Sequence, residues 1–469
     1  TGSRPIFRVC LAQDPGVGPF RVEVRSGEHR TELQDVVHGD VFLCSGQSNM
    51  ELGPGWDRLF ADRFRGHPQV RMLHIDFDRH EPDRTPRASA RLWSKGNAAQ
   101  SWRPMALADI SHHSAVCSAF GQELAARLRL PSGPVRALGL VLAAFGSTPL
   151  QAFLPATVAK RVMAECPASA TPKFWDRTSH IWNAALAPLA LAQTCFAAVL
   201  WYQGEDNSHS VSDAEAYACH LRLFFEGLRS QFCTPSTRPL QIHYVELASR
   251  NTTTGRHTRY YFKIRQSQEQ VRQSLPQVFA TTALDLGAFL NSHPPHKWQL
   301  GQRLAALVHH WYYGNISVPV AGPELRCADL TVQASTRTAT LRMHFRPAPV
   351  ALQSTMDCTA CCTDGTPFEY AIIVPAGPPS ELSLDHGRAP WQPLHVRAQG
   401  DTLTGTVRWP EPNASPNAVL QVRYAFQDFV HCALFAEGLD WPARHFSFRL
   451  DWPANDGGQA GTCSAVLAG

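Results

Sequence analysis

The middle of the chain alternates short apolar runs with stretches of helical periodicity. Between the runs, apolar residues recur every third or fourth position, as Val116, Phe120, Leu124 and Leu128 do. Five runs have the length and composition of buried strands: residues 41–44, 138–144, 196–202, 240–247 and 278–284. Strands that are apolar on both sides and separated by helices form a parallel sheet covered on both faces. We therefore predict a doubly wound α/β domain over residues 36–317, built on a five-stranded parallel sheet.

Both ends of the chain carry a different pattern. Apolar and polar residues alternate in four segments: 20–25, 339–345, 403–409 and 420–426. A period of two indicates half-exposed antiparallel strands. We therefore expect residues 1–35 to be an N-terminal β segment and residues 318–469 to be a β-rich domain. A single β module built from both ends is an alternative.

Composition and charge exclude several classes of protein. Of the 469 residues 44% are hydrophobic and 17% are charged, and the formal net charge is only +4. These values exclude intrinsic disorder, and the absence of a dense lysine and arginine run argues against nucleic-acid and anionic-membrane partners. The longest apolar stretch, residues 184–202, is interrupted by Pro188, Gln193 and Thr194, so we expect no membrane span.

Cysteines and glycosylation motifs favour the secretory pathway. The 13 cysteines are too few for a disulfide scaffold, and their odd number leaves at least one without an internal partner. Acceptors of the Asn-X-Ser/Thr type occur at Asn251, Asn315 and Asn413. The sequence opens at Thr1 without an apolar leader, so we expect a signal peptide to be absent or already removed. We predict a secreted or lysosomal protein, and the cysteine pairing and the oligomeric state stay open.

Residues suited to acyl transfer follow the predicted strands. Ser48 follows the first strand, Gly146 the second and Gln203 the third, while Asp285 and His293 follow the fifth. The carboxyl ends of parallel strands meet at one edge of the sheet, where ligands bind. A serine attacks an acyl carbon once a histidine accepts its proton. Backbone N–H groups of Ser48 and Gly146, with the amide of Gln203, would then stabilise the oxyanion.

Each of these residues also has a structural explanation. Ser48 lies between a strand and a predicted helix, where serine is a favoured N-cap. Gly146 could allow a tight turn, and Gln203 could satisfy buried backbone groups. Metal binding is the competing chemistry, but two prolines separate His293 from His296 and argue against a helix that presents both imidazoles. No zinc-protease, phosphate-loop or dinucleotide motif is present, which argues against the sites that those motifs build.

Five ordered blocks resemble the sialate O-acetylesterases, a branch of the SGNH hydrolase superfamily. They are GDVFLCSGQSNM at 39–50, SAVC with FG at 114–121, FGSTP at 145–149, WNA with WYQGEDN at 182–207, and HPPHK with GQRLA at 293–305. The resemblance implies a flavodoxin-like SGNH fold and a truncated N-terminal β domain. It also implies hydrolysis of acetyl esters on sialic acids without a metal or an organic cofactor. By this match Ser48 is the nucleophile, His293 the base, and Ser48, Gly146 and Gln203 the oxyanion donors.

The chain departs from the SGNH pattern at the catalytic acid. Many SGNH hydrolases carry an aspartate three residues before the histidine, but Leu290 stands there. A backbone carbonyl can also fix the tautomer of an imidazole. We therefore predict a Ser48–His293 dyad and keep Asp285 as a candidate third member.

Substrate recognition would require a cation for the carboxylate of a sialic acid. Arg265 is the candidate, and a solvent-facing charge on a helix is the alternative reading of the same residue. Two other functions stay open. One is an acetylesterase for other carbohydrates such as xylan, and the other is a catalytically impaired glycan-binding protein.

Overall fold

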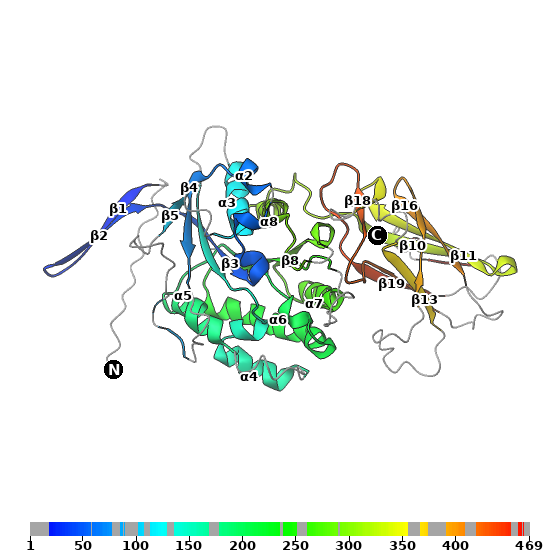
Figure 1. The fold of residues 1–469 in the computed structure, drawn as a ribbon, viewed down its shortest axis with the longest axis horizontal. Helices are drawn as coiled ribbons and strands as arrows, with labels where there is room; N and C mark the ends of the chain where they lie inside the picture. The colour runs from blue at the N-terminus through cyan, green and yellow to red at the C-terminus, as the bar shows by residue number, and fades with distance from the viewer. Residues whose placement is uncertain are drawn as a thin grey trace.

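The structure is a computed structural model that describes residues 18–461 and Cys463, apart from several internal segments. The segments left out are residues 58, 77–84, 88, 90–101, 107–112, 129–135, 168–177, 235–237, 251–259, 289–290, 355–365, 374–390, 409–418, 452–457 and 462. An α/β part occupies the middle of the molecule, and a β-rich part lies at one end of the longest axis (Figure 1).

A seven-stranded sheet forms the centre of the α/β part, with the strand order β5-β4-β6-β3-β7-β8-β9. All neighbours pair in parallel except β5, which is antiparallel to β4 at the edge. The strands are β3 (Gly39–Gly46), β4 (His67–His74), β5 (Arg103–Met105), β6 (Ala137–Ala144), β7 (Ala198–Tyr202), β8 (Gln241–Glu246) and β9 (Val278–Thr282).

The prediction of five strands is wrong by two, because β4 and β5 extend the sheet at one edge. The five predicted runs correspond to β3, β6, β7, β8 and β9. The sequence of β4, HPQVRMLH, mixes polar and apolar residues and forms no apolar run. β5 has only three residues, and its Pro104 is a residue confined to edge strands and strand starts.

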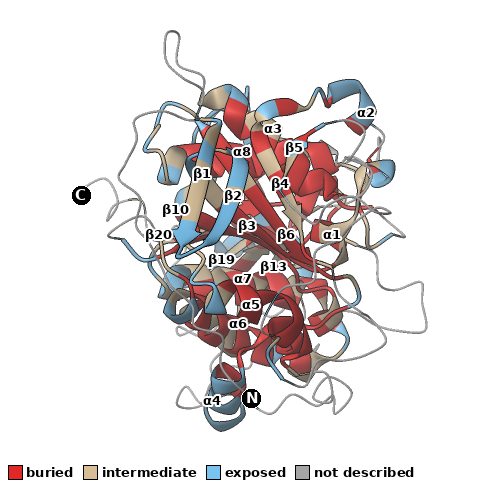
Figure 2. Cartoon of the chain, turned by 90° about the vertical axis from the view of Figure 1, so that its left-hand side faces the viewer, coloured by how far each residue is buried: buried red, intermediate tan, exposed pale blue. Residues whose placement is uncertain are grey.

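Helices cover both faces of this sheet (Figure 1). α3 (Ala115–Arg127) and α8 (Lys297–Trp311) pack together on one face, and α6 (Val211–Gln231) and α7 (Tyr261–Ser274) pack together on the other. The remaining helical segments are short: α1 (Ser48–Glu51), α2 (Phe60–Arg63), α4 (Ala156–Glu165), α5 (Ala187–Leu191), η1 (Pro54–Trp56), η3 (Leu150–Phe153), η5 (Trp182–Leu186), η6 (Asp206–Ser208), η7 (Leu284–Leu286) and η8 (Ala334–Thr336). The central strands are buried, whereas α4 is largely exposed (Figure 2).

The region after α8 consists of antiparallel strands around a second apolar core. One sheet has the order β15-β16-β11-β10-β20, another the order β14-β13-β17-β19, and β12 pairs with β18. The strands are β10 (Glu324–Gln333), β11 (Thr338–Arg346), β12 (Val350–Ser354), β13 (Phe368–Ile373), β14 (Gln392–Pro393), β15 (Val396–Gln399), β16 (Thr402–Arg408), β17 (Val419–Tyr424), β18 (Cys432–Ala436), β19 (Phe446–Asp451) and β20 (Gln459–Gly461).

The N-terminal strands are separate from these sheets. β1 (Phe20–Ser26) and β2 (His29–Val36) form an antiparallel hairpin and, among the residues described, pair only with each other. The hairpin lies at the opposite end of the molecule from the C-terminal sheets (Figure 1) and is largely exposed (Figure 2). Among the described residues, the hairpin and the C-terminal strands therefore do not form one β module.

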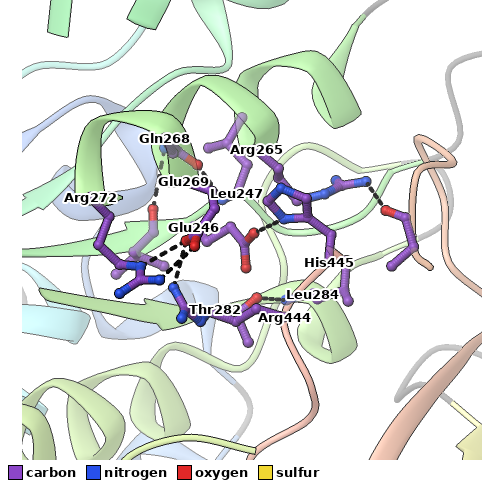
Figure 3. Close-up of polar contacts among 12 residues, drawn as sticks. Glu246, Leu247, Arg265, Gln268, Glu269, Arg272, Thr282, Leu284, Arg444 and His445 are labelled. Atoms are coloured by element: carbon purple, nitrogen blue, oxygen red, sulfur yellow. Dashed lines mark hydrogen bonds and ion pairs between the residues drawn. The ribbon is translucent and has the colours of Figure 1, made fainter. Parts of the chain in front are cut away.

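Buried polar contacts join the C-terminal region to the α/β part (Figure 3). His445 forms a hydrogen bond with the carboxylate of Glu246 at the end of β8, and both side chains are almost completely buried. Arg444 donates to Glu269 of α7 over 2.7 Å, and Arg272 binds the same carboxylate. Polar and charged groups of both parts are thus paired in a largely buried contact.

Four disulfides cross-link the described residues: Cys44–Cys117, Cys166–Cys219, Cys195–Cys233 and Cys327–Cys463. Disulfides persist in oxidising compartments, which fits a protein of the secretory pathway. Of the three predicted glycosylation acceptors, Asn315 is half-buried, and Asn251 and Asn413 lie outside the described residues. Within the part of the chain that the structure describes, no helix has the length and apolarity needed to cross a membrane.

Candidate active site

A sharp turn after β3 presents Ser48 at the carboxyl edge of the sheet. Gly46 ends the strand with φ +138°, and a Cβ at this position would lie 2.1 Å from the carbonyl oxygen of Tyr202. Only glycine fits so close to the neighbouring strand. The backbone N–H of Gln47 then donates to the same carbonyl of Tyr202 over 3.0 Å, and α1 begins at Ser48. Gln47, not Ser48, is the residue at the N-cap, so capping does not explain the serine.

Ser48 and His293 meet at this edge. The hydroxyl oxygen of Ser48 lies 3.0 Å from Nε2 of His293, although the two residues are 245 positions apart in the chain. Both side chains are half-buried, so a substrate can approach them. With Nδ1 carrying the ring hydrogen, Nε2 accepts the hydrogen of the serine hydroxyl. This is the geometry that a general base requires.

The surroundings of His293 keep its ring neutral. Burial, followed by the positive charges of Lys297 and Arg250, lowers the pKa of His293 below its ordinary value. A lower pKa means that the imidazole is unprotonated at neutral pH, as a base must be. Asn291 accepts the backbone N–H of His293 over 2.9 Å and so orders the turn that carries the ring.

A buried polar cluster lies beneath the serine and the histidine. The amide of Asn49 donates to the carboxylate of Glu205 and to the carbonyl oxygen of Ser292, the latter over 2.8 Å, and its own oxygen accepts from Lys297. Asn49 follows Ser48 and Ser292 precedes His293, so this amide is a second link between the two loops. Burial raises the pKa of Glu205 and lowers that of Lys297, each to about 7.

The three predicted oxyanion donors are not equivalent in the structure. Gly146 lies against Ser48, since a Cβ on it would be 3.1 Å from the Cβ of the serine. Its N–H donates to the carboxylate of Glu51 over 2.7 Å, so a substrate oxyanion would have to displace that carboxylate. Glu51 stands three residues after Ser48, a spacing that places both on one side of a helical turn.

Gln203 is placed differently from the prediction. Its side chain is completely buried, and its amide nitrogen donates to Asn207 over 2.8 Å and to the carbonyl oxygen of Thr148 over 3.3 Å. Its amide oxygen accepts from the hydroxyl of Tyr217 over 2.8 Å. An amide whose hydrogens are both bonded inside the protein has none left for an oxyanion. The structure therefore supports the alternative reading, in which Gln203 satisfies buried polar groups.

Asp285 is not the acid behind His293. Both of its carboxylate oxygens accept from the guanidinium of Arg303, each over 2.7 Å, in a buried pair. Leu290, which stands at the usual position of the acid, lies outside the described residues. Within the described part of the chain, the ring of His293 hydrogen bonds to Ser48 alone.

Arg265 is neither at the site nor in solvent, so both readings of it are wrong. Its side chain is completely buried, and its guanidinium donates to the carbonyl oxygens of Ala425 and Gln427 in the C-terminal region. The helical spacing could have indicated its burial. Arg265 comes four residues after Tyr261 and three before Gln268, so all three lie on the buried face of α7.

A group of three potential metal ligands lies close together in another part of the described chain. These are Asp329, His344 and Cys463, in the C-terminal region. The sulfur of Cys463 is bonded to Cys327, so it cannot act as a thiolate ligand there.

Comparison with known proteins relates the chain to carbohydrate esterases. Residues 38–310 match the family described as carbohydrate esterase, sialic acid-specific acetylesterase. The sialate O-acetylesterase of Rattus norvegicus is 27% identical over 362 residues, 66% of this chain and 64% of that protein. The human sialate O-acetylesterase is 25% identical over 338 residues, 66% of this chain and 61% of that protein. The chain thus spans less than two thirds of the length of these relatives.

A solved structure shares the fold. It is that of a carbohydrate acetylesterase from Xanthomonas citri, which superposes with a TM-score of 0.67 at 20% sequence identity. The similarity covers 92% of this chain and 85% of the other, and therefore includes strands outside the α/β part.

Proposed function

Since the chain belongs to the sialic acid-specific acetylesterase family of carbohydrate esterases, we propose that it is a serine esterase that removes acetyl groups from sialic acids. The observation that carries this proposal is the 3.0 Å contact between the Ser48 hydroxyl and His293 Nε2. The names of the related sialate O-acetylesterases supply the substrate class. Four disulfides support action in a secreted or lysosomal setting.

Acylation begins when the Ser48 oxygen attacks the acetyl carbonyl carbon while His293 Nε2 takes its proton. The carbonyl oxygen becomes an oxyanion, which the N–H groups of Ser48 and Gly146 stabilise. For this, the N–H of Gly146 must first release the carboxylate of Glu51 and then donate to the oxyanion. The C–O bond to the sugar then breaks, and His293 returns its proton to the leaving sugar oxygen. The products of this half are a free sugar hydroxyl and an acetylated Ser48.

Deacylation repeats these steps with water as the nucleophile. His293 takes a proton from water while the water oxygen attacks the acetyl carbonyl carbon on Ser48. The bond to Ser48 then breaks, acetate leaves, and His293 returns the proton to Ser48. The serine and the histidine act as a dyad in this scheme. The amide of Asn49, which joins the two loops, contributes to their alignment.

Substitution of the nucleophile tests the proposal. Ser48→Ala should lower the rate of acetate release from acetylated sialic acid by at least about 10³-fold, because no other described hydroxyl lies against His293. Thermal unfolding should be unchanged, since the serine hydroxyl makes no other hydrogen bond among the residues described. Ser26→Ala, which alters an exposed serine of the N-terminal hairpin, is the matched control. Undiminished activity of Ser48→Ala would refute the assignment.

Two comparisons separate the neighbouring functions. Rates on acetylated sialic acid and on acetylated xylan, measured side by side, distinguish a sialate esterase from an esterase for other carbohydrates. A glycan-binding protein without catalysis would bind sialoglycans yet turn over no small acetate ester.

A further inference from the structure

An exposed tryptophan lies beside the catalytic base. Trp56 keeps 46% of its surface accessible, and its ring centre is 5.2 Å from that of His293 in an edge-on arrangement. Tryptophan is highly buried on average, so an accessible one next to a reactive group indicates a binding surface. A flat indole matches the C–H face of a pyranose ring.

The backbone of this tryptophan is held firmly. Trp56 closes η1, the turn after α1, by donating its N–H to the carbonyl oxygen of Gly53 over 3.1 Å. The next residue, Asp57, is buried and accepts the backbone N–H groups of Leu59 and Trp298. Trp298 belongs to the first turn of α8, which directly follows the loop of His293. The turn that carries the indole is therefore anchored to α8, the helix that follows the loop of His293.

A cation lies on the other loop of the site. Arg250 follows β8 at the carboxyl edge of the sheet, and its positive charge is one of those that lower the pKa of His293. One guanidinium nitrogen donates to the hydroxyl of Tyr261 over 3.4 Å, and Nε is buried without a hydrogen-bond partner among the described residues. A buried N–H without a partner is rare and favours an acceptor from outside.

The C-terminal region holds this arginine in place. The backbone N–H of Arg250 donates to the carbonyl oxygen of Asp428 over 2.8 Å, and the carboxylate of Asp428 accepts the N–H of Phe262 at the start of α7 over 3.0 Å. One residue of the C-terminal region thus contacts both the loop of Arg250 and the helix that follows it.

We propose that Trp56 and Arg250 form the sugar-binding subsite of this esterase, in which the indole stacks on the sugar ring and the guanidinium binds the carboxylate of an acidic sugar. The proposal rests on the proposed function and specifies its substrate class. It replaces Arg265, which is buried elsewhere. Selection of the sugar would then depend on the C-terminal region through Asp428.

Three substrates test the subsite: an O-acetylated sialic acid, its carboxyl methyl ester and glyceryl triacetate. Arg250→Gln should lower the ratio of kcat/KM for the free acid over the methyl ester by about 10- to 100-fold, the value of a charged hydrogen bond. Trp56→Ala should lower the ratio of either sugar over glyceryl triacetate by about tenfold or more, mainly through KM, and Trp56→Phe should restore part of it. Trp311→Ala, which alters a tryptophan that is 42% exposed at the far end of α8, should change neither ratio.

The contrary outcomes are distinct. If Arg250→Gln reduces both sugar substrates equally, the arginine only orders its loop and the carboxylate assignment is overturned. If Trp56→Ala reduces glyceryl triacetate as much as the sugars, the indole supports His293 and not the substrate. If the unmodified protein releases acetate from none of the three, the proposed function itself fails.

Discussion

The charges around His293 set the pH range in which its imidazole can act as a base. Lys297 stands four residues after His293, at the start of α8, and its buried ammonium is one cause of the lowered pKa of the imidazole. The neutral ring is the active form, so kcat/KM should rise as pH increases through this pKa and reach a plateau above it.

Lys297→Met should move this acidic limb to higher pH. Removal of a positive charge favours the protonated imidazole, which raises the pKa of His293. Lys263→Met is the matched control, because Lys263 is also buried but its charge is not among those that act on His293. The check is the pH profile of kcat/KM for acetate release. An unchanged limb in Lys297→Met, or an equal shift in the control, would contradict this account.

At the scale of single residues, the sequence predicts which residues lie at the carboxyl edge of the sheet but not the direction of their side chains. Ser48, Gly146 and His293 meet because each follows a strand of one parallel sheet. Gln203 follows such a strand too, yet its amide faces inward to Asn207, because its bonding partners come from other segments. No local sequence pattern predicts such hydrogen-bond partners.

At the scale of elements, the turn after β3 leaves little freedom for substitution. Gly46→Ala would place a methyl group 2.1 Å from a backbone oxygen, with φ at +138°. We expect a loss of more than about 3 kcal/mol in the free energy of unfolding and a corresponding loss of activity, since Ser48 is two residues away.

Gly314→Ala provides the comparison for this substitution. Gly314 has φ +75°, but a Cβ there meets no atom within 4 Å. The cost should be the backbone term alone, about 1–2 kcal/mol. Urea denaturation of both variants measures the difference, and equal losses would show that the close approach to Tyr202 is unimportant.

A strand was predictable from the sequence where both of its faces are completely buried. β7, with the sequence AVLWY, is buried at every position and reads as an apolar run. β4 shares the edge of the sheet with the short β5, so its side chains alternate between buried and accessible positions and its sequence resembles a surface strand. A search for apolar runs finds the centre of such a sheet before its edges.

At the scale of the whole molecule, the ionic contacts of Figure 3 couple the two large parts. Burial opposes ionisation of Glu246, but His445 and Arg444 together outweigh it and lower the pKa of this carboxyl group. Residues 246 and 445 are 199 positions apart, so no periodicity of the sequence could reveal their contact.

Stability should therefore fall in acid. A carboxyl group whose pKa is lower in the folded protein contributes stability above its unfolded value, about 4.3 for glutamate, and loses it as pH falls through the folded value. Glu246→Gln should lower the free energy of unfolding by about 3–5 kcal/mol at pH 7, because it leaves His445 and Arg444 without this charge. The difference in free energy of unfolding between this variant and the unmodified protein should become smaller below about pH 4.

Urea denaturation at pH 7 and at acid pH measures this gap. Glu165→Gln is the control, since Glu165 pairs with Arg161 on the exposed surface of α4, where ion pairs contribute little. A gap that stays constant with pH would show that Glu246 does not act through its charge.

The dependence of buried α/β charges on residues of the C-terminal region has a consequence for biosynthesis. A ribosome delivers Glu246, Arg265 and Glu269 long before Gln427, Arg444 and His445, so these side chains must remain hydrated or be shielded by a chaperone in the interval. The bond between Cys327 and Cys463 likewise has to wait until Cys463 has been synthesised. The α/β part should therefore complete its packing only after the C-terminal region has been synthesised, and a stop codon before Arg444 should leave Glu246 and Glu269 without these partners.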